Sequence, residues 1–341
     1  MQKRFLFFIC CCLSLSFAFI KEHGLFLKPT HFPEPRYDFS KNPLDSATIE
    51  LGRILFYDPI LSANNSISCA SCHSPFNAFA HTDHNLSHGI YDSIGNRNAP
   101  ALFNLAWQKS FMWDGAINHL DMQALAPLAH PKEMGSSISA LIEKLKASSD
   151  YKRLFFNAYH DSAINSTGIL KAFAQFQLTL VSANAKYDSV ILGKEKFSDQ
   201  ERNGYALYKK NCSNCHTEPL FSNFEYEQNG LPTDAYFNDQ GRFGISQNEM
   251  DKMKFKVPSL RNLAYTYPYM HDGRFSTLKE VIQHYTTLPQ GATQQSAKIK
   301  LPMQLTSNEK VDLLAFLTTL NDRAFVFNKN HQYKKLPAFK K

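Results

Sequence analysis

The stretch Cys69-Ala70-Ser71-Cys72-His73 reads C-x-x-C-H, the attachment signature of a c-type haem. The same spacing returns at Cys212-Ser213-Asn214-Cys215-His216. In each copy the two thiols become thioethers, and the histidine becomes the proximal ligand of the iron. The chain of 341 residues is therefore expected to carry two covalently attached haems, ligated by His73 and His216.

The cysteine count supports this interpretation. Seven cysteines are present: Cys10, Cys11 and Cys12 lie in an apolar N-terminal stretch, and the two signatures use the other four. The alternatives are a zinc knuckle or a redox dithiol. A four-cysteine zinc site would have to join pairs about 140 residues apart and would leave both histidines unexplained. The haem reading accounts for all six residues.

The first 20 residues predict an export signal. Two basic residues, Lys3 and Arg4, precede an apolar run from Phe5 to Ile20 that ends near a small-x-small site at Ser16-Phe17-Ala18. The run is short for a membrane span, which needs about 20 residues. We therefore expect a signal peptide over 1–20 and a periplasmic protein, with an uncleaved membrane anchor as the alternative.

The charge balance gives no sign of a nucleic-acid partner. The formal charge is +7, and two of these charges leave with the predicted leader. The propionates of two haems would bring the mature protein close to neutral. No basic run with interleaved aromatic residues is present, so nucleic-acid binding is not expected.

The hydrophobic pattern predicts a mostly α protein. Helices are expected over 47–57, 137–146, 151–159, 169–184, 198–208, 278–285 and 311–320. Ser46 and Ser307 are the expected caps of the first and last, and Ser198 with Glu201 forms a capping box. No strand pattern with clear alternation is found. The apolar face of the segment 169–184, formed by Ala172, Phe173, Phe176, Leu180 and Val181, is interpreted as plain core.

Two similar domains follow from the order of these features. Each half contains a helix, a C-x-x-C-H signature, a long polar loop and a closing helix, an order that resembles a cytochrome c domain. This is an approximate internal duplication. We expect two cytochrome c-like α domains, one over 21–190 and one over 191–341, each with one haem.

Beyond the haem signatures, several short stretches resemble the bacterial di-haem cytochrome c peroxidase family, which includes the MauG-type enzymes. The resemblance covers residues 47–320. The stretches are Arg97-Asn98-Ala99-Pro100, Trp113-Asp114-Gly115, Gln123 with Pro127, Pro131-Lys132-Glu133-Met134-Gly135, Pro258-Ser259-Leu260-Arg261-Asn262 and Pro268-Tyr269-Met270-His271-Asp272-Gly273.

The resemblance implies a catalytic pair and an electron route. Gln123 and Glu133 match a glutamine and a glutamate, ten residues apart, in the family's peroxide pocket. Cleavage of the O–O bond needs a proton moved between its oxygens, which a carboxylate can do, while an amide can orient the peroxide. Trp113 matches a tryptophan that the family places between the haems. Trp107 has no such match and is expected in the core.

The resemblance also implies a calcium ion between the domains. Asn98 supplies a side-chain oxygen at the matching position, and Thr266 and Pro268 supply backbone carbonyls. Oxygen ligands of mixed origin suit calcium. Arg97 and Arg261 are candidates to pair with haem propionates through charge-assisted hydrogen bonds.

Two axial ligands remain open. On the C-terminal haem, Tyr285 lies fourteen residues after His271, where many members have Met and MauG-type members have Tyr. Met270 is the second candidate and Met303 the third. On the N-terminal haem, His88 is the best match to a removable loop ligand, although its spacing to Arg97 is longer than expected. His81 and His84 lie in the same loop.

Three functions are compatible with this sequence. The first is reduction of hydrogen peroxide with electrons from a small c-type cytochrome or cupredoxin, by a protein that is often a homodimer in this family. The second is a MauG-like oxidation of a protein side chain or another substrate through a high-valent state, which Tyr285 favours. The third is electron transfer without turnover, which Gln123 and Glu133 disfavour because a carrier needs no acid–base group at its iron.

Overall fold

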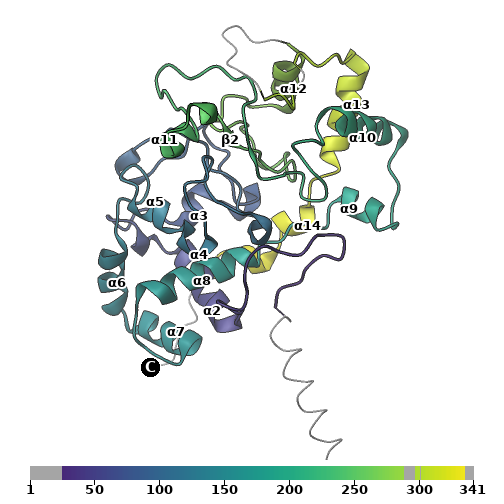
Figure 1. The fold of residues 1–341 in the computed structure, drawn as a ribbon. Coiled ribbons are helices and arrows are strands. Elements are labelled where there is room, and N and C mark those ends of the chain that lie inside the picture. The colour runs from purple at the N-terminus through teal and green to yellow at the C-terminus, as the bar shows by residue number, and fades with distance from the viewer. Residues whose placement is uncertain (1–24, 288–295, 300, 335–341) are drawn as a thin grey trace, which may run out of the picture.

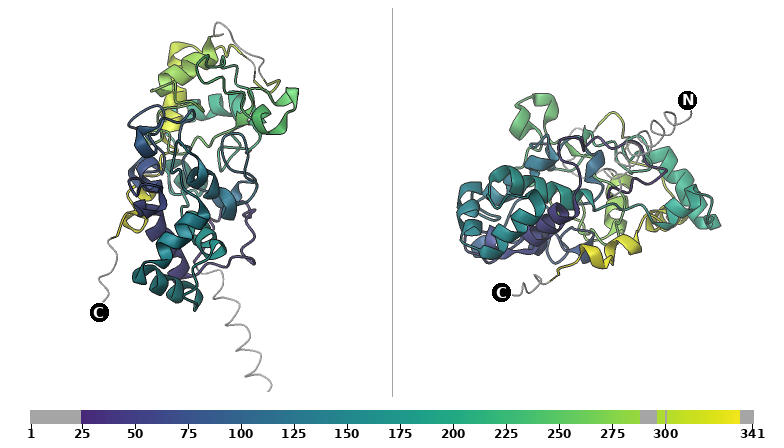
Figure 2. Two further views of the ribbon diagram at one scale, coloured as in Figure 1. Left: turned by 90° about the vertical axis from the view of Figure 1, so that its left-hand side faces the viewer. Right: turned by 90° about the horizontal axis from the view of Figure 1, so that it is seen from below.

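Two pairs of crossing helices organise the chain (Figure 1). The computed structural model describes residues 25–287, 296–299 and 301–334. In the first pair, α2 (Ser46–Tyr57) packs on α8 (Ser166–Leu178), and in the second, α10 (Asp199–Asn211) packs on α13 (Ser307–Thr318). Each pair is the centre of one half of the molecule, and Figure 2 shows the same ribbon from two further sides.

Both crossings depend on a glycine. A Cβ on Gly52 of α2 would lie 1.9 Å from the carbonyl oxygen of Ala172, and one on Gly204 of α10 would lie 1.9 Å from that of Asp312. Only a residue without a side chain allows helices this close. A phenylalanine of the partner helix, Phe176 or Phe316, packs beside each glycine. The predicted duplication is thus visible as one helix crossing built twice.

The remaining elements are short. The other helices are α3 (Cys69–Cys72), α4 (Leu120–Gln123), α5 (Leu125–Ala129), α6 (Ile138–Lys146), α7 (Ser149–Tyr159), α9 (Lys186–Ile191), α11 (Phe243–Ser246), α12 (Leu278–Thr286) and α14 (Arg323–Val326). Single 3₁₀ turns are η1 (Pro59–Leu61), η2 (Pro75–Asn77), η3 (Ile90–Asp92), η4 (Leu105–Trp107), η5 (Glu249–Asp251) and η6 (Lys329–His331). The prediction of a mostly α protein is confirmed.

Three local predictions are corrected. Asp45, not Ser46, caps α2, because its carboxylate accepts from the backbone N–H groups of Ala47 and Thr48. Thr306, not Ser307, caps α13 in a reciprocal box with Glu309. A small antiparallel sheet of β1 (Tyr226–Glu227) and β2 (Phe255–Lys256) is present where no strand was expected. The capping box of Ser198 and Glu201 is confirmed.

Helix α8 ends at Leu178, six residues before the predicted end. Tertiary partners take the backbone N–H groups that follow. Ser182 donates to Asn104 Oδ1, and Ala183 and Asn184 both donate to Asp322 Oδ2, each at 2.9 Å. These bonds fix the connection between the halves in an extended form, which a longer helix would prevent.

The last described elements return to the first half. Phe325 and Val326 of α14 belong to the same hydrophobic core as α2 and α8. The Phe325 ring lies 5.9 Å from that of Phe103 and 6.1 Å from that of Phe79. The predicted boundary at 190/191 does not anticipate this return. Trp107 is buried in this core as expected and donates from Nε1 to the carbonyl of Pro33.

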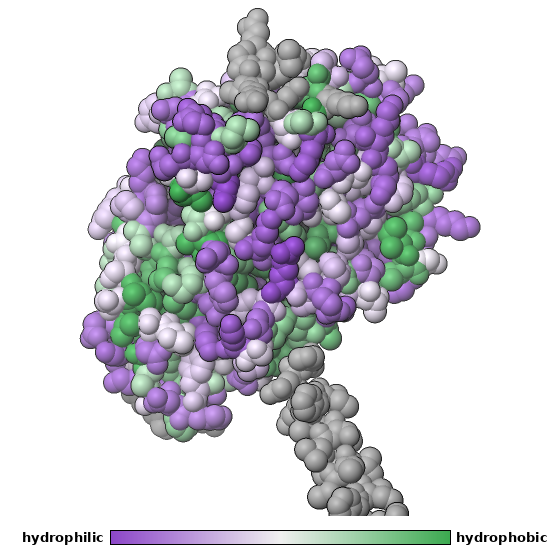
Figure 3. Space-filling model, in the orientation of Figure 1, coloured by the Kyte–Doolittle hydropathy of each residue, from purple (hydrophilic) through white to green (hydrophobic). Residues whose placement is uncertain are grey.

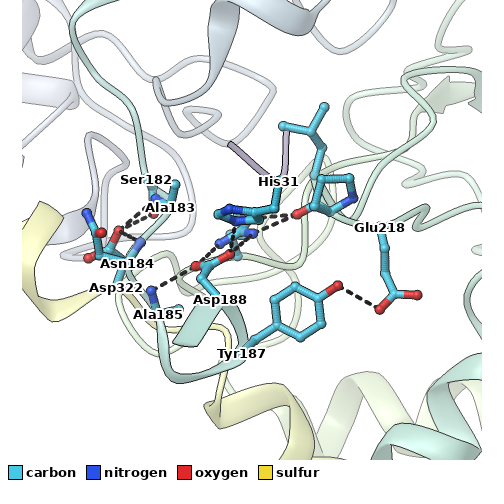
Figure 4. A network of polar contacts seen from close by, with 12 residues as sticks. His31, Ser182, Ala183, Asn184, Ala185, Tyr187, Asp188, Glu218 and Asp322 are labelled. Carbon is cyan, nitrogen blue, oxygen red and sulfur yellow. Dashed lines mark hydrogen bonds and ion pairs between the residues drawn. The ribbon is translucent and has the colours of Figure 1, made fainter. Parts of the chain in front are cut away.

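A buried polar cluster joins the N-terminal arm, the connection and the second half (Figure 4). Asp188 Oδ2 accepts from Nη1 of Arg261 at 2.9 Å and Oδ1 from Nη2 at 2.7 Å, and His31 Nε2 lies 2.7 Å from the same Oδ1. Burial alone would raise the pKa of Asp188, but the hydrogen bonds and charge of Arg261 outweigh it and lower that pKa. Asp188 is therefore a buried carboxylate held in its charged form.

The face drawn in Figure 3 is mostly hydrophilic, with separate apolar patches. Within the part of the chain that the structure describes, no helix is long and apolar enough to cross a membrane. The predicted leader over 1–20 lies outside the described residues.

Candidate haem sites

The histidine of each signature is prepared to bind a metal. His73 Nδ1 donates to the carbonyl of Phe79 at 2.8 Å, and His216 Nδ1 lies 3.0 Å from that of Pro258. A carbonyl oxygen only accepts, so the proton resides on Nδ1 and the lone pair of Nε2 is free. Burial also lowers the pKa of both histidines to about 4. Each imidazole is thus the neutral ligand that iron requires.

The donor groups of each signature are those that hold a c-type haem. Cys212, Cys215 and His216 line a cavity of about 290 Å³ with mainly apolar walls. Cys69, Cys72 and His73 line a smaller one of about 50 Å³. The four cysteines are free thiols. Each cavity therefore offers two thiols for covalent attachment and one imidazole nitrogen for the iron.

Gln123 and Glu133 converge on the smaller cavity, where both line the wall with His73. Gln123 comes from α4 and is buried. The Glu133 side chain is 39% exposed, and His130 Nδ1 lies 3.7 Å from its Oε1. Partial burial raises the pKa of Glu133, and His130 offsets only part of this effect. The pair predicted from the sequence therefore meets beside the same histidine.

A tight backbone contact holds Glu133 in place. Ile90 N donates to the carbonyl of Glu133 at 2.8 Å, and a Cβ on Gly89 would lie 2.0 Å from the carbonyl oxygen of Lys132. Because Gly89 has no side chain, the loop that contains the histidines packs directly on the Glu133 turn. The loop thus positions the carboxylate through its backbone.

His88 itself does not line the smaller cavity. Its Nδ1 lies 2.5 Å from Asp92 Oδ1, and its ring stacks on His84 at 4.8 Å, which in turn stacks on His81 at 5.7 Å. Its backbone carbonyl lies 3.9 Å from Cys72 Sγ, so this loop borders the first signature. The prediction of His88 as a haem ligand stays a prediction.

Gln177 is a polar residue of this cavity that the sequence did not reveal. It lies near the end of α8, is buried, and lines the wall with Gln123 and Glu133. Its Nε2 donates to Gln123 Oε1 at 3.1 Å. The sequence placed this helix in the core, because one amide in an apolar stripe carries no functional signal.

Trp113 lies on the wall of the larger cavity, which extends from Gln123 to His216. Its indole Nε1 donates to the carbonyl of Asn98 at 2.8 Å, and its own carbonyl accepts from Lys256 N at 2.7 Å. These two bonds, one to each half, tie the Trp113 residue to both halves of the molecule. Its position is compatible with the predicted bridge, whose electron transfer remains a prediction.

The three residues proposed for calcium, Asn98, Thr266 and Pro268, line the same cavity. Asn98 Nδ2 donates to the carbonyl of Asn85 at 3.1 Å, so its Oδ1 is the end left for a cation. Among the described residues, no group of three or more His, Cys, Asp or Glu side chains is placed to hold a metal ion. The predicted set of amide and backbone oxygens is of a different kind, and it remains a prediction.

Tyr285, Met270 and Met303 all line the cavity of His216. Burial raises the pKa of Tyr285 to about 12. Asn229, which the sequence did not single out, bonds to the Tyr285 side chain and donates from Nδ2 to Met270 Sδ at 3.5 Å. Its Oδ1 accepts from Leu231 N, which fixes the amide orientation. Asn229 thus contacts both candidate ligands and does not choose between them, so Tyr285 stays a prediction.

Replacing Tyr285 by phenylalanine is expected to change the absorption spectrum and raise the reduction potential of one haem only, because a phenolate stabilises the oxidised iron. Redox titration of the holoprotein measures both. Tyr205→Phe is the control, since Tyr205 bonds to Glu218 and does not line the cavity. If the absorption spectra and reduction potentials of both haems are unchanged in Tyr285→Phe, Tyr285 is not a ligand.

The two arginines already have protein partners. Arg97 pairs with Asp114 and Asp239, each at 2.6 Å. Arg261 is fully buried, and its guanidinium bonds to Asp188 and to the carbonyl of Pro219. Arg261 also lines the cavity of His216, and the pairing of both arginines with haem propionates stays a prediction.

Comparisons with known proteins agree with this geometry. A family model described as di-haem cytochrome c peroxidase matches residues 46–196, and a cytochrome c model matches residues 201–321. The chain is 36% identical to the methylamine utilization protein MauG of Methylorubrum extorquens over 86% of its length and 83% of that protein. It is 34% identical to the cytochrome c551 peroxidase of Nitrosomonas europaea over 82% of its length and 81% of that protein.

A solved structure is similar over nearly the whole chain. It is the crystal structure of a MauG-like protein associated with microbial copper homeostasis, with a TM-score of 0.80 and 32% identity. The match covers 89% of this chain and 97% of that one.

Proposed function

Because the chain belongs to the di-haem cytochrome c peroxidase family, we propose that it reduces hydrogen peroxide to water with electrons from a small donor protein. One peroxide, two electrons and two protons give two waters. The observation that carries the proposal is the convergence of Gln123 and Glu133 on the cavity of His73. A pure electron carrier has no use for such a pair.

The residues of the smaller cavity divide the work. When bound, the haem on His73 supplies the redox chemistry that reduces the peroxide. The Glu133 carboxylate takes the proton of one peroxide oxygen and gives it to the other, so that a water leaves. Gln123 donates a hydrogen bond that orients the peroxide. The raised pKa of Glu133 brings it closer to that of the groups it must protonate.

The larger cavity is the proposed entry for electrons. A small c-type cytochrome or cupredoxin docks on the half that contains His216, and Trp113 lines the same cavity as that histidine and Gln123. The donor is tested by adding reduced cytochrome c or reduced cupredoxin to the holoprotein with peroxide. Steady, peroxide-dependent oxidation of either one is the expected result. No consumption of any donor contradicts this function.

A MauG-like oxidation is the second candidate, favoured by Tyr285 on the cavity wall and by the 36% identity to a MauG protein. In that case peroxide would oxidise the two haems without consuming a donor. The oxidised protein would then persist for minutes and decay on addition of a protein substrate. Rapid return to the resting spectrum with reduced donor excludes this candidate.

Calcium at Asn98, Thr266 and Pro268 is part of the proposal. Asn98 also accepts the Trp113 indole at its backbone carbonyl, so a cation there would stiffen the bridge. Metal analysis of the purified holoprotein is expected to give one calcium per chain, and Asn98→Ala is expected to lose it. Retention of calcium by that variant would exclude this site.

A periplasmic location and a homodimer complete the proposal. Cell fractionation of the full chain, and of a variant without residues 1–20, tests the leader. The full chain is expected in the periplasmic fraction if the leader is cleaved, and in the membrane fraction if the leader stays attached as an anchor. The molar mass of the holoprotein, measured by light scattering, tests the dimer. A mass that corresponds to one chain would exclude it.

A further inference from the structure

Gln177 has a side-chain oxygen without a partner in the peroxide pocket. The residue is 4% exposed, and its Oε1 is buried with no hydrogen bond from any described residue. A buried polar atom without a hydrogen bond destabilises the folded protein. Leucine or methionine would fill the same position in α8 without this cost. Packing therefore does not explain why this position of α8 holds an amide.

The neighbouring Gln175 shows what a structural glutamine looks like in the same helix. Its Nε2 donates to Asn42 Oδ1 and to the carbonyl of Pro43, and its Oε1 accepts from Asp45 N at 2.9 Å. All its hydrogen-bonding groups thus have partners in the N-terminal arm. Gln177 differs because its Oε1 has no hydrogen-bond partner, while the residue lines the cavity of His73.

The hydrogen bond between Gln177 and Gln123 determines which groups of the two amides stay free. Gln177 Nε2 donates to Gln123 Oε1 at 3.1 Å, so the oxygen of Gln123 is occupied. No described residue accepts a hydrogen bond from Gln123 Nε2. The linked amides therefore present one free donor, Gln123 Nε2, and one free acceptor, Gln177 Oε1, and both residues line the cavity of His73.

We propose that Gln177 acts with Gln123 as one unit that binds and orients the peroxide. The donor and acceptor match a hydroperoxide, which accepts at one oxygen and donates an O–H. A diatomic such as carbon monoxide has no proton to give to Gln177 Oε1. Gln177 also positions Gln123, because its amide holds Gln123 with the N–H groups turned to the cavity. This inference rests on the proposed peroxidase function.

A double-mutant cycle in the holoprotein tests the unit. Gln177→Leu and Gln123→Leu are each expected to lower kcat/KM for hydrogen peroxide about tenfold, the effect of one lost hydrogen bond in a closed pocket. The double variant is expected to be no slower than the slower single variant. Gln177→Met serves as a second uncharged replacement if Gln177→Leu does not fold.

The C–O stretch of the carbon monoxide complex gives a readout that does not need turnover. A donor near the bound ligand lowers this frequency, so both single variants are expected to raise it by the same amount, with no further rise in the double variant. Gln175→Leu is the control: it is expected to lower thermal stability and leave the stretch and kcat/KM unchanged.

The outcomes separate the two proposals. If Gln177→Leu keeps the wild-type stretch and kcat/KM, or if the effects of the two leucine variants add, the unit does not exist. If the wild-type holoprotein turns over no peroxide but the stretches shift together, the peroxidase function fails and the coupling of the amides stands.

Discussion

Glu133→Gln is expected to lower kcat/KM for hydrogen peroxide by about 10² to 10⁴-fold, the usual contribution of a positioned acid–base group. The substitution keeps the size of the side chain and its ability to accept a hydrogen bond. It removes the capacity to take a proton from one peroxide oxygen and return it to the other. Stopped-flow mixing of the holoprotein with peroxide measures the loss.

Glu143→Gln is the matched control. Glu143 is an exposed carboxylate of α6 that pairs with Lys146, and it lines neither haem cavity. It is expected to leave kcat/KM unchanged. A loss of less than tenfold in Glu133→Gln, with both haems spectroscopically intact, would show that another group moves the proton.

The pH dependence of the rate is an independent test of the role of Glu133. Burial raises the pKa of Glu133, and the carboxylate must be unprotonated to accept the first proton. The rate is therefore expected to fall as the pH drops through this raised pKa, which lies above the ordinary glutamate value of about 4.3. Glu133→Gln is expected to lack that acidic limb. An identical profile in the two proteins contradicts the assignment.

The sequence predicted the parts of the site that depend on short, local spacing. The C-x-x-C-H motif determines both attachment points and both proximal ligands, because all its members act on one haem. Helix starts with a reciprocal cap, such as Ser198 with Glu201, are equally local. Gln123 and Glu133 came from the family resemblance, and the structure brings them to the same cavity.

The sequence did not predict contacts between distant residues. Arg261 was expected to pair with a haem propionate, and its protein partner Asp188 lies 73 residues earlier in the chain. The hydrogen bond between Gln177 and Gln123 spans 54 residues. The return of α14 to the first core has no local signal either. In each case the fold supplies a partner that no motif spacing records.

Asp188→Asn is expected to lower the free energy of unfolding by about 3–5 kcal/mol, because it leaves a buried charge without its counterion. Arg261 is fully buried against the rings of Phe32 and Phe221, at 5.0 and 5.5 Å from their centroids. No water reaches it to replace the carboxylate. Urea titration of the holoprotein measures the loss. Asp199→Asn, an exposed partner of Arg202, is the control and is expected within about 0.5 kcal/mol of wild type.

The same variant has a pH signature with a definite sign. The pKa of Asp188 is lowered by Arg261 in the folded protein, so its contribution is fully present above the unfolded value of about 3.9 and is lost as the pH falls through the folded value. The stability gap between wild type and Asp188→Asn is thus expected to be full at pH 7 and to narrow in acid. A gap that does not depend on pH would point to lost packing.

Asp188→Asn is also expected to destabilise one haem site more than the other. Arg261 follows Pro258 by three residues, and the carbonyl of Pro258 orients His216 through Nδ1. Loosening Arg261 therefore disturbs the ligand of the C-terminal haem, while His73 is oriented by Phe79 in the other half. In a thermal melt of Asp188→Asn, the absorption of the His216 haem is expected to change at a lower temperature than that of the His73 haem. Simultaneous loss of both would mean that Asp188 stabilises the whole molecule and not the segment that orients His216.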